Sequence, residues 1–410
     1  MPLTPVISTL IGVIHISTGP IKTISINIYL YYLLHKRGVI HTMKISCQKS
    51  DLLNGVNTSL KAVSTRTTLP ILQCILLQAS GDLFRLVSND LELGIESYVK
   101  STIIESGSIA LDAKIFSEIV KKLPDAEVTI IVDESNLTTI TCEKSIFKIP
   151  GQAGTEFIQL PQITKDKNIS MSQAVLKDMI HQTIFSIAVK EIKPILTGEL
   201  LEIKGNAFSI VSMDGYRISI RQTAFSESFD NTSVVVPGKT LSEISKILSS
   251  DEADMLSVYF TDKHILFELE DSIVVSRLLE GDYPKYASLF SADYDTLITV
   301  ERRELMMSIE RAALIARESK KSPIKMEIRD SVLAITSNTE LGNVHEEINI
   351  QQEGQNLEIA FNPKYMIDSL KAISDEEICL QFTNALNPCI IRQVQGDDFK
   401  YLILPIRLNG

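Results

Sequence analysis

The segment KIFSEIVK, residues 114–121, has two counterparts later in the chain. They are KTLSEISK at 239–246 and KYMIDSLK at 364–371, so a lysine–acid–lysine pattern returns at a constant spacing of 125 residues. Positions i, i+4 and i+7 lie on one face of an α-helix. Because insertions would blur such a register, we infer one structural unit that the chain uses three times.

In every copy, the apolar residues lie half a turn away from the charged positions. The pattern predicts three amphipathic helices, each buried on one side and showing a lysine–acid–lysine stripe on the other. For a single copy, a solvated helix face is the simpler interpretation, but three copies in register favour a shared surface. The apolar positions are Phe116, Ile119, Val120 and Leu123, then Leu241, Ile244 and Leu248, then Met366, Leu370 and Ile373.

Length and charge narrow the class of protein. A chain of 410 residues suits about two to four domains, and the repeat selects three. We expect domains at 43–161, 162–290 and 291–410, with linkers near 161–168 and 290–295. The net charge of −11 comes from 51 acidic and 40 basic residues. This balance argues against a generic nucleic-acid binder, unless the basic residues gather on one wall.

The first 42 residues differ from the rest: they contain no Asp or Glu and carry an apolar run from Ile24 to Leu34. The run is shorter than the ~20 residues that a membrane span needs, and it lacks the basic start of a signal peptide. A peripheral anchor is one explanation, and upstream sequence translated from a start assigned too early is the other. We favour the second and expect residues 1–42 to lie outside the native fold, because Met43 begins the first repeat directly.

The same order of elements is predicted in each unit from its apolar spacing. A strand and a helix come first, with the helices at 51–64, 171–189 and 301–318. Short alternating strands follow, then the amphipathic helix, then further strands at 128–132, 256–260 and 378–382. Each unit is therefore expected to be α+β, with two helices on one face of an antiparallel sheet.

Motifs for catalysis or metal binding are missing. The five cysteines show no CxxC spacing and are odd in number, which is typical of free thiols in a reducing compartment. The segment 238–240, GKT, resembles the end of a phosphate-binding loop, but Ser233 stands where the motif needs glycine. Asp214, followed by Gly215, is a candidate catalytic aspartate, although a turn aspartate is the commoner case. We predict no enzymatic activity, no cofactor and no metal.

Six local sequences resemble the bacterial DNA polymerase III β subunits, the family of sliding clamps. They occur in order and in all three units, and the resemblance runs from residue 43 to residue 408, so it is specific although no single motif would suffice. The six are RTTLPIL (66–72), SNDLE (88–92), DGYR (214–217), EGDYP (280–284), FNPKY (361–365) and LPIRL (404–408).

The resemblance implies a ring of two chains joined head to tail, with three clamp domains per chain. Helices would line the hole and sheets would form the outer rim. Duplex DNA would then be held by charge without base readout, and the acidic excess would lie outside. The helix after Val300 is the most basic. Candidate phosphate-facing residues are Arg66, Lys114, Lys121, Lys122, Lys190, Lys193, Lys239, Lys246, Arg302, Arg303, Arg311, Lys364 and Lys371.

The family also implies a groove between the second and third units. There it accepts short linear peptides, with a Gln and two large apolar residues, from the replicative polymerase, the clamp loader and repair proteins. Met213 and Ser288 depart from the expected threonine and arginine. For 402–408, an ordinary core strand is an equal alternative. The implied wall is Leu196, Gly215, Tyr216, Arg217, Ile218, Pro284, Leu289, Asn362, Tyr365, Leu386, Pro388, Leu402, Leu404, Pro405, Ile406 and Arg407.

By the same resemblance, the chain is a non-catalytic processivity subunit of the polymerase in the cytoplasm, without a membrane partner. Two alternatives from other classes stay open. One is a hydrolase that uses the turn aspartates, and it predicts turnover by the chain alone. The other is a scaffold of three repeats that does not bind DNA, and it predicts no salt-sensitive retention on plasmid.

Overall fold

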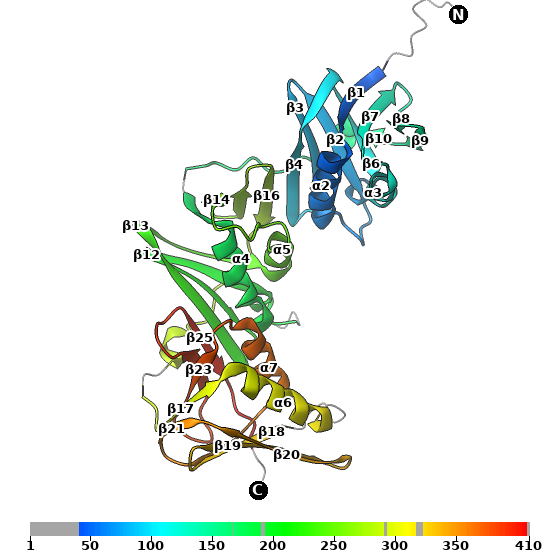
Figure 1. Ribbon diagram of the computed structural model, residues 1–410. Coiled ribbons are helices and arrows are strands. Elements are labelled where there is room, and N and C mark those ends of the chain that lie inside the picture. Colours follow the sequence, from blue (N-terminus) through cyan, green and yellow to red (C-terminus); the bar gives the residue numbers. More distant parts are fainter. Residues whose placement is uncertain (1–40, 167, 190–192, 291–292, 317–322, 408–410) are drawn as a thin grey trace, which may run out of the picture.

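The computed structural model describes residues 41–166, 168–189, 193–290, 293–316 and 323–407 (Figure 1). Three units follow one another along an arc, with the helices towards its concave side and many of the strands on its outer side (Figure 1). The first strand begins at His41, two residues before Met43. The rest of the predicted N-terminal extension, residues 1–40, lies outside the described residues.

The first unit begins with a strand and a helix, as predicted. The second helix, α3, begins after Asp112, whose side chain accepts a hydrogen bond from the Ile115 N–H at 2.8 Å. Such a cap satisfies a backbone donor that the first helical turn leaves open. The elements are β1 (His41–Gln48), α2 (Lys49–Ser59), β2 (Cys74–Ser80), β3 (Leu83–Asn89), β4 (Leu93–Val99), β5 (Ser101–Glu105), β6 (Gly107–Asp112), α3 (Ala113–Lys122), β7 (Glu127–Asp133), β8 (Leu137–Cys142), β9 (Ser145–Pro150) and β10 (Gln152–Ala153).

The second unit repeats this order with two long strands. Its first helix, α4, is shorter than predicted: it ends at His181, and the Thr183 hydroxyl then donates back to the Met179 carbonyl at 2.8 Å. This side-chain bond competes with continued helical bonding. The elements are β11 (Asn168–Ser172), α4 (Gln173–His181), β12 (Gly198–Met213), β13 (Arg217–Pro237), α5 (Gly238–Ile244), β14 (Met255–Phe260), β15 (His264–Glu268) and β16 (Ser272–Arg277).

The third unit contains α6, the longest helix among the described residues, within the predicted range 301–318. Its second helix, α7, has Pro363 at its first position, and the Asn362 side chain caps the Lys364 N–H at 3.0 Å. The elements are β17 (Thr296–Glu301), α6 (Arg302–Ala316), β18 (Ile324–Arg329), β19 (Val332–Thr339), β20 (Gly342–Asn349), β21 (Gln351–Gly354), β22 (Leu357–Phe361), α7 (Pro363–Ala372), β23 (Glu377–Phe382), β24 (Cys389–Gln393) and β25 (Phe399–Ile403).

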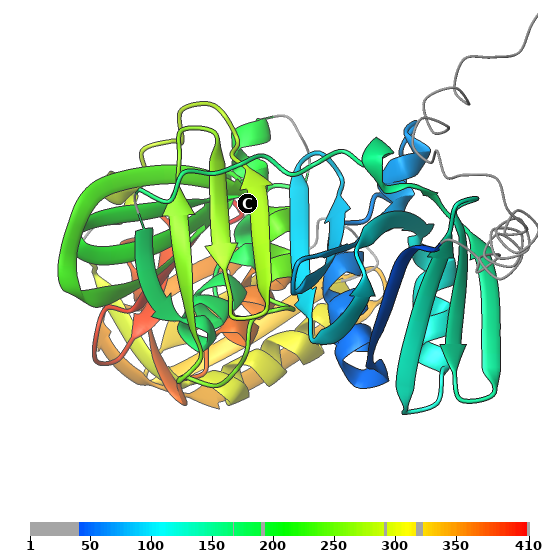
Figure 2. The ribbon, with the colours of Figure 1, turned by 90° about the horizontal axis from the view of Figure 1, so that it is seen from above.

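The α+β class and the three repeats are confirmed, but the sheets cross the boundaries between units. A nine-stranded sheet joins the first two units, because β4 pairs antiparallel with β16. A seven-stranded sheet joins the second and third, because β13 pairs with β25. Seen from above, strands of the first and second units lie side by side (Figure 2). Backbone hydrogen bonds therefore hold neighbouring units together, in addition to side-chain packing.

Each unit has its own apolar core between helices and sheets. Phe116, Leu241 and Met366, one from each amphipathic helix, are completely buried. Burial of a large apolar side chain stabilises a fold by ~1.5–3 kcal/mol. All five cysteines are buried free thiols. In the described part of the chain, no helix is long and apolar enough to cross a membrane.

Candidate functional site

The lysine–acid–lysine stripes lie on helices of the concave side, in α3, around α5 and in α7 (Figure 1). All six stripe lysines are exposed, while the apolar positions of each copy are buried or half-buried. The predicted amphipathic pattern is therefore present in all three copies. The second copy departs in one detail, since α5 ends at Ile244 and Lys246 lies in the turns that follow.

Several of the candidate phosphate-facing residues already have partners in the protein. Lys239 forms an ion pair with Asp90 of the first unit, and Lys246 pairs with Glu243 at 2.7 Å. Lys371 pairs with Glu310 of α6 at 2.9 Å, and the Arg311 guanidinium binds Glu346 of β20.

Arg302 is half-buried, and it donates to the backbone carbonyls of Asp375 and Leu370 at 2.8 and 3.2 Å. This side chain anchors the start of α6 to the end of α7. Arg302 therefore holds two helices together, whereas the sequence predicted that it would face DNA phosphates.

The remaining described candidates are exposed. Within the described ranges, none of them forms an ion pair, so their charge is available to a partner. Lys190 lies outside the described residues. The exposed cations are Arg66, Lys114, Lys121, Lys122, Lys193, Arg303 and Lys364. Four of these seven belong to the first unit, and we call the seven the unpaired cations.

A groove with a volume of about 380 Å³ lies where β13 meets β25, at the boundary of the second and third units. Its wall is mainly apolar and includes residues of the turn 214–217. The structure brings eight of the sequence-predicted residues into this wall: Gly215, Tyr216, Arg217, Ile218, Leu289, Pro388, Leu402 and Leu404.

The other predicted wall residues take different places around the groove. Leu196 is buried in the apolar cluster beneath it, and Tyr365 stacks on Tyr216 with ring centroids 6.1 Å apart. Asn362 caps α7, and Pro284 lines a separate hollow. Leu386, Pro405, Ile406 and Arg407 are not part of the wall itself. The Ile406 N–H instead donates to the Ala360 carbonyl at 2.7 Å, which attaches the C-terminal segment to β22.

The segment 402–408 combines the two interpretations that the sequence left open. Its first residues belong to β25, which ends at Ile403, so part of it is a core strand. Leu402 is almost completely buried, yet it and the more exposed Leu404 both line the groove. The end of the strand and the residue after it therefore both contribute to the wall.

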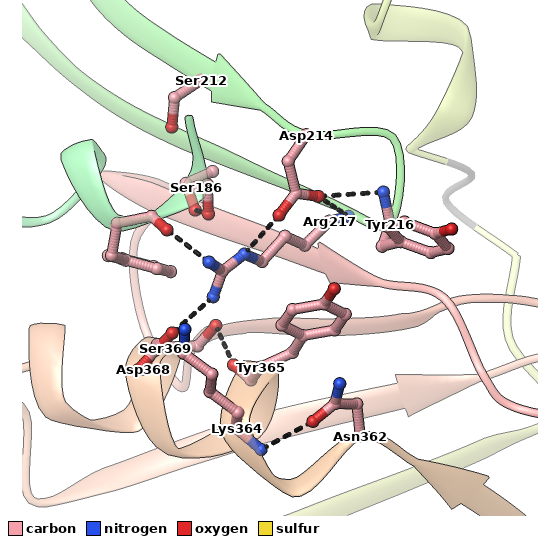
Figure 3. Close-up of polar contacts among 12 residues, drawn as sticks. Ser186, Ser212, Asp214, Tyr216, Arg217, Asn362, Lys364, Tyr365, Asp368 and Ser369 are labelled. Atoms are coloured by element: carbon pink, nitrogen blue, oxygen red, sulfur yellow. Dashed lines mark hydrogen bonds and ion pairs between the residues drawn. The ribbon is translucent and has the colours of Figure 1, made fainter. Parts of the chain in front are cut away.

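Arg217 connects the groove to the junction between units (Figure 3). Its Nε donates to Asp214 Oδ2 at 3.0 Å, and its Nη1 donates to Asp368 Oδ2 of α7 at 2.8 Å. Its Nη2 donates to the Phe185 carbonyl. The guanidinium also lies over the Tyr365 ring, 4.6 Å from the centroid. Only 6% of the Arg217 side chain is exposed, so these contacts are largely desolvated and strong.

The Asp214 side chain stabilises the turn 214–217 by accepting hydrogen bonds from its backbone. Its Oδ1 accepts hydrogen bonds from the Tyr216 and Arg217 N–H groups at 2.9 and 3.1 Å. Gly215 has φ +91°, a conformation that favours glycine. With both carboxylate oxygens engaged, Asp214 is the turn aspartate that the sequence analysis preferred.

Some wall residues lay outside the sequence prediction. Thr383, Asn387 and Ile390 come from the β23–β24 segment, which faces the groove only because β24 pairs with β25. Met213 and Ser288, noted in the sequence only as departures, also line the wall. No local signal identifies the first three, because their position depends on strand order.

Two observations concern a metal site and a phosphate-binding loop. Among the described residues, no cluster of His, Cys, Asp and Glu is placed to hold a metal. In the GKT segment, the Thr240 hydroxyl is buried and shares a hydrogen bond with Ser276 at 2.8 Å. Since Lys239 pairs with Asp90, this segment is committed to packing between units.

Comparison with known families decides the assignment. Three family models match, described as the N-terminal, central and C-terminal domains of the DNA polymerase III beta subunit, at residues 43–161, 170–285 and 287–407. The chain belongs to this family. It is a DNA sliding clamp of DNA polymerase III, as the resemblance in its sequence implied.

Individual relatives are similar to this clamp in sequence and in structure over 89–90% of its chain. The beta sliding clamp of Bacillus subtilis is 38% identical over 377 residues, which cover 89% of this chain and all of the relative. A putative DNA polymerase III beta subunit from Eubacterium rectale is 48% identical, with a TM-score of 0.87 over 89% of this chain and all of that one. The Bacillus subtilis clamp structure gives 37% identity and a TM-score of 0.87.

Proposed function

We propose that two copies of this clamp close head to tail into a ring around duplex DNA and tether partner proteins to it. The domains of each copy are 43–161, 162–290 and 291–410, and the ring acts without catalysis in the cytoplasm. The observation that carries the proposal is the arc of three repeats with helices on its concave side (Figure 1). A second arc joined end to end gives a closed ring with helices facing the hole.

The unpaired cations are the proposed DNA contacts. A phosphate can bind an exposed, unpaired ammonium or guanidinium without breaking an existing ion pair. Contacts of this kind carry no base information, which suits a ring that slides. The paired residues Lys239, Lys246, Arg311 and Lys371 contribute less, because each must first leave a carboxylate.

The ring junction is assigned to β9 of one copy and β20 of the other. β9 is an edge of the five-stranded sheet of the first unit, and β20 is an edge of the four-stranded sheet of the third. On the other edge of the latter sheet, the Ala360 carbonyl of β22 already accepts a hydrogen bond from the Ile406 N–H of the C-terminal segment. Ile146 on β9 and Leu314 on α6 are more than 60% exposed. Pairing would cover these apolar side chains and both edges.

The groove at the β13–β25 junction is the proposed site for partner peptides from the polymerase, the clamp loader and repair proteins. Its volume is within the range of ligand pockets, and its apolar wall suits two large side chains. The polar side chains of Ser288 and Asn387 in the same wall suit the polar anchor of such a peptide.

Binding of a short synthetic peptide with a Gln and two large apolar residues tests the groove. We expect Leu404→Glu to weaken binding at least tenfold, because a carboxylate would enter the apolar wall. Deletion of 404–410 should abolish binding and leave the dimer. Leu83→Glu is the matched control, since Leu83 is exposed on β3 of the first unit. Unchanged affinity in the Leu404 and deletion variants would contradict the assignment.

A further inference from the structure

A second hollow adjoins the peptide groove and has no role in the function proposed above. Its volume is about 810 Å³, and β12, β13 and the segment 278–288 form its walls. Ser288 lines both hollows. Leu200 of the second hollow packs in the same apolar cluster as Met213 and Ile218 of the groove. We call this second hollow the annex.

The annex and the groove differ in charge. The only charged residue of the groove wall within the described chain is Arg217, which the two aspartates already neutralise. The annex wall carries more carboxylates than ammonium groups: Glu202, Asp262, Glu280 and Asp282 against Lys204 and Lys285.

Three of these carboxylates are available to a ligand. Glu202 is already engaged, since it binds the Lys204 Nζ at 2.7 Å and accepts from the Tyr286 hydroxyl at 3.0 Å. Asp262, Glu280 and Asp282 are exposed, and none forms an ion pair with another described residue. The annex therefore presents a net negative wall directly beside an apolar groove.

The turn 280–282 places two of the three carboxylates on the exposed rim. Gly281 has φ +128°, where a residue with a side chain would be strained. Nearby, the Tyr283 hydroxyl donates to the Val211 carbonyl at 3.2 Å, and this bond holds the turn against β12. This bond restrains the backbone of the rim next to Asp282 before any ligand arrives, which lowers the entropy that binding costs.

We propose that the annex binds a basic flank of the partner peptide, meaning Lys or Arg residues adjacent to the apolar motif in the groove. This inference rests on the proposed peptide groove. A peptide that continues past Ser288 enters the annex, where its cations meet Asp262, Glu280 and Asp282. Such complementarity selects partners with a basic flank over partners with an acidic one.

Fluorescence anisotropy with three synthetic peptides tests the proposal. They are the core motif alone, the core with two lysines, and the core with two glutamates, each flank being placed at either end in turn. We expect the lysine flank at one end to tighten binding about two- to tenfold at low salt, the range for exposed ion pairs. High salt should remove the gain, since exposed charges are screened. The glutamate flank should weaken binding.

Two double variants distinguish binding in the annex from a general effect of the negative charge of the protein. Glu280→Gln with Asp282→Asn should lose the gain from lysines and keep the affinity for the core. Glu134→Gln with Asp82→Asn, which neutralises two exposed acids of the first domain, should keep both. A gain that is absent at both ends, or that persists in the first double variant, would overturn the annex alone. Failure of the core peptide to bind the unchanged clamp would overturn the groove and the annex together.

Discussion

Arg217 combines two tasks at the scale of a single residue. It lines the groove, and it bridges the second and third domains through Asp214 and Asp368 (Figure 3). A guanidinium suits this position because its planar fork donates to several acceptors at fixed angles, which an ammonium cannot reproduce. The sequence pointed to the groove role through the DGYR motif. It gave no sign of the bridge, because Asp368 is 151 residues away.

Replacing Arg217 tests the bridge. We expect Arg217→Ala to lower the free energy of unfolding by about 3–5 kcal/mol, because it leaves two aspartates without their buried partner. Arg217→Lys should recover only part of the loss. Urea unfolding measures the effect, and Arg329→Ala, an exposed arginine of the same chain, should change stability by less than about 0.5 kcal/mol. Equal effects at both positions would contradict the bridge.

Glu199 makes stability depend on pH. Burial within the second domain raises the pKa of this carboxyl to about 8, because the charged form loses its contact with water. The folded state therefore holds a proton that the unfolded state loses above about pH 4.5. Stability from this group is complete below the unfolded pKa and declines as pH rises towards 8.

Thermal unfolding between pH 5 and 8 measures this dependence. We expect the melting temperature to fall with rising pH in the unchanged clamp, and Glu199→Gln to flatten the slope because glutamine has no proton to lose. Glu134→Gln, at an exposed position, should leave the slope unchanged. An unaltered slope in Glu199→Gln would refute the account of this residue.

At the scale of elements, the helices were more predictable than the sheets. The 3.6-residue periodicity of KIFSEIVK and its two counterparts reports burial locally, so the amphipathic helices follow from the sequence. The pairing of β4 with β16 and of β13 with β25 does not, because an alternating strand pattern shows which face is buried but not which strand is the neighbour. For the same reason, Ile390 and Asn387 of the groove wall escaped prediction.

The α3 helix tests which lysines contact DNA. We expect Lys121→Ala with Lys122→Ala to reduce the salt dependence of binding to a short duplex by about 2 in the slope of log K against log salt, because each lost phosphate contact removes about 0.9. Lys246→Ala with Lys371→Ala should have a smaller effect, since both lysines already pair with carboxylates. Fluorescence anisotropy over a salt series distinguishes them, and equal slopes would contradict the distinction.

At the scale of the whole molecule, a net charge of −11 is compatible with binding an anionic duplex when the exposed cations gather on the wall that faces the duplex, as the proposed ring requires. The helices of the three domains face the concave side of the arc, where the unpaired cations are proposed to meet DNA. The carboxylates of the annex line a hollow beside β12 and β13. Cross-boundary strand pairing keeps the three domains in an arc. In the proposed ring, retention on DNA is a matter of topology, and weak, non-specific contacts suffice to keep the duplex centred.

Retention on plasmid DNA tests the ring most directly. After loading onto a nicked circular plasmid, the clamp should stay bound through a wash at about 0.5 M salt, which screens the phosphate contacts, and should leave when the plasmid is cut. Ile146→Asp with Leu314→Asp, which places charges at the proposed junction, should release the clamp from the circle too. Equal loss of the unchanged clamp from circular and linear DNA would contradict a closed ring.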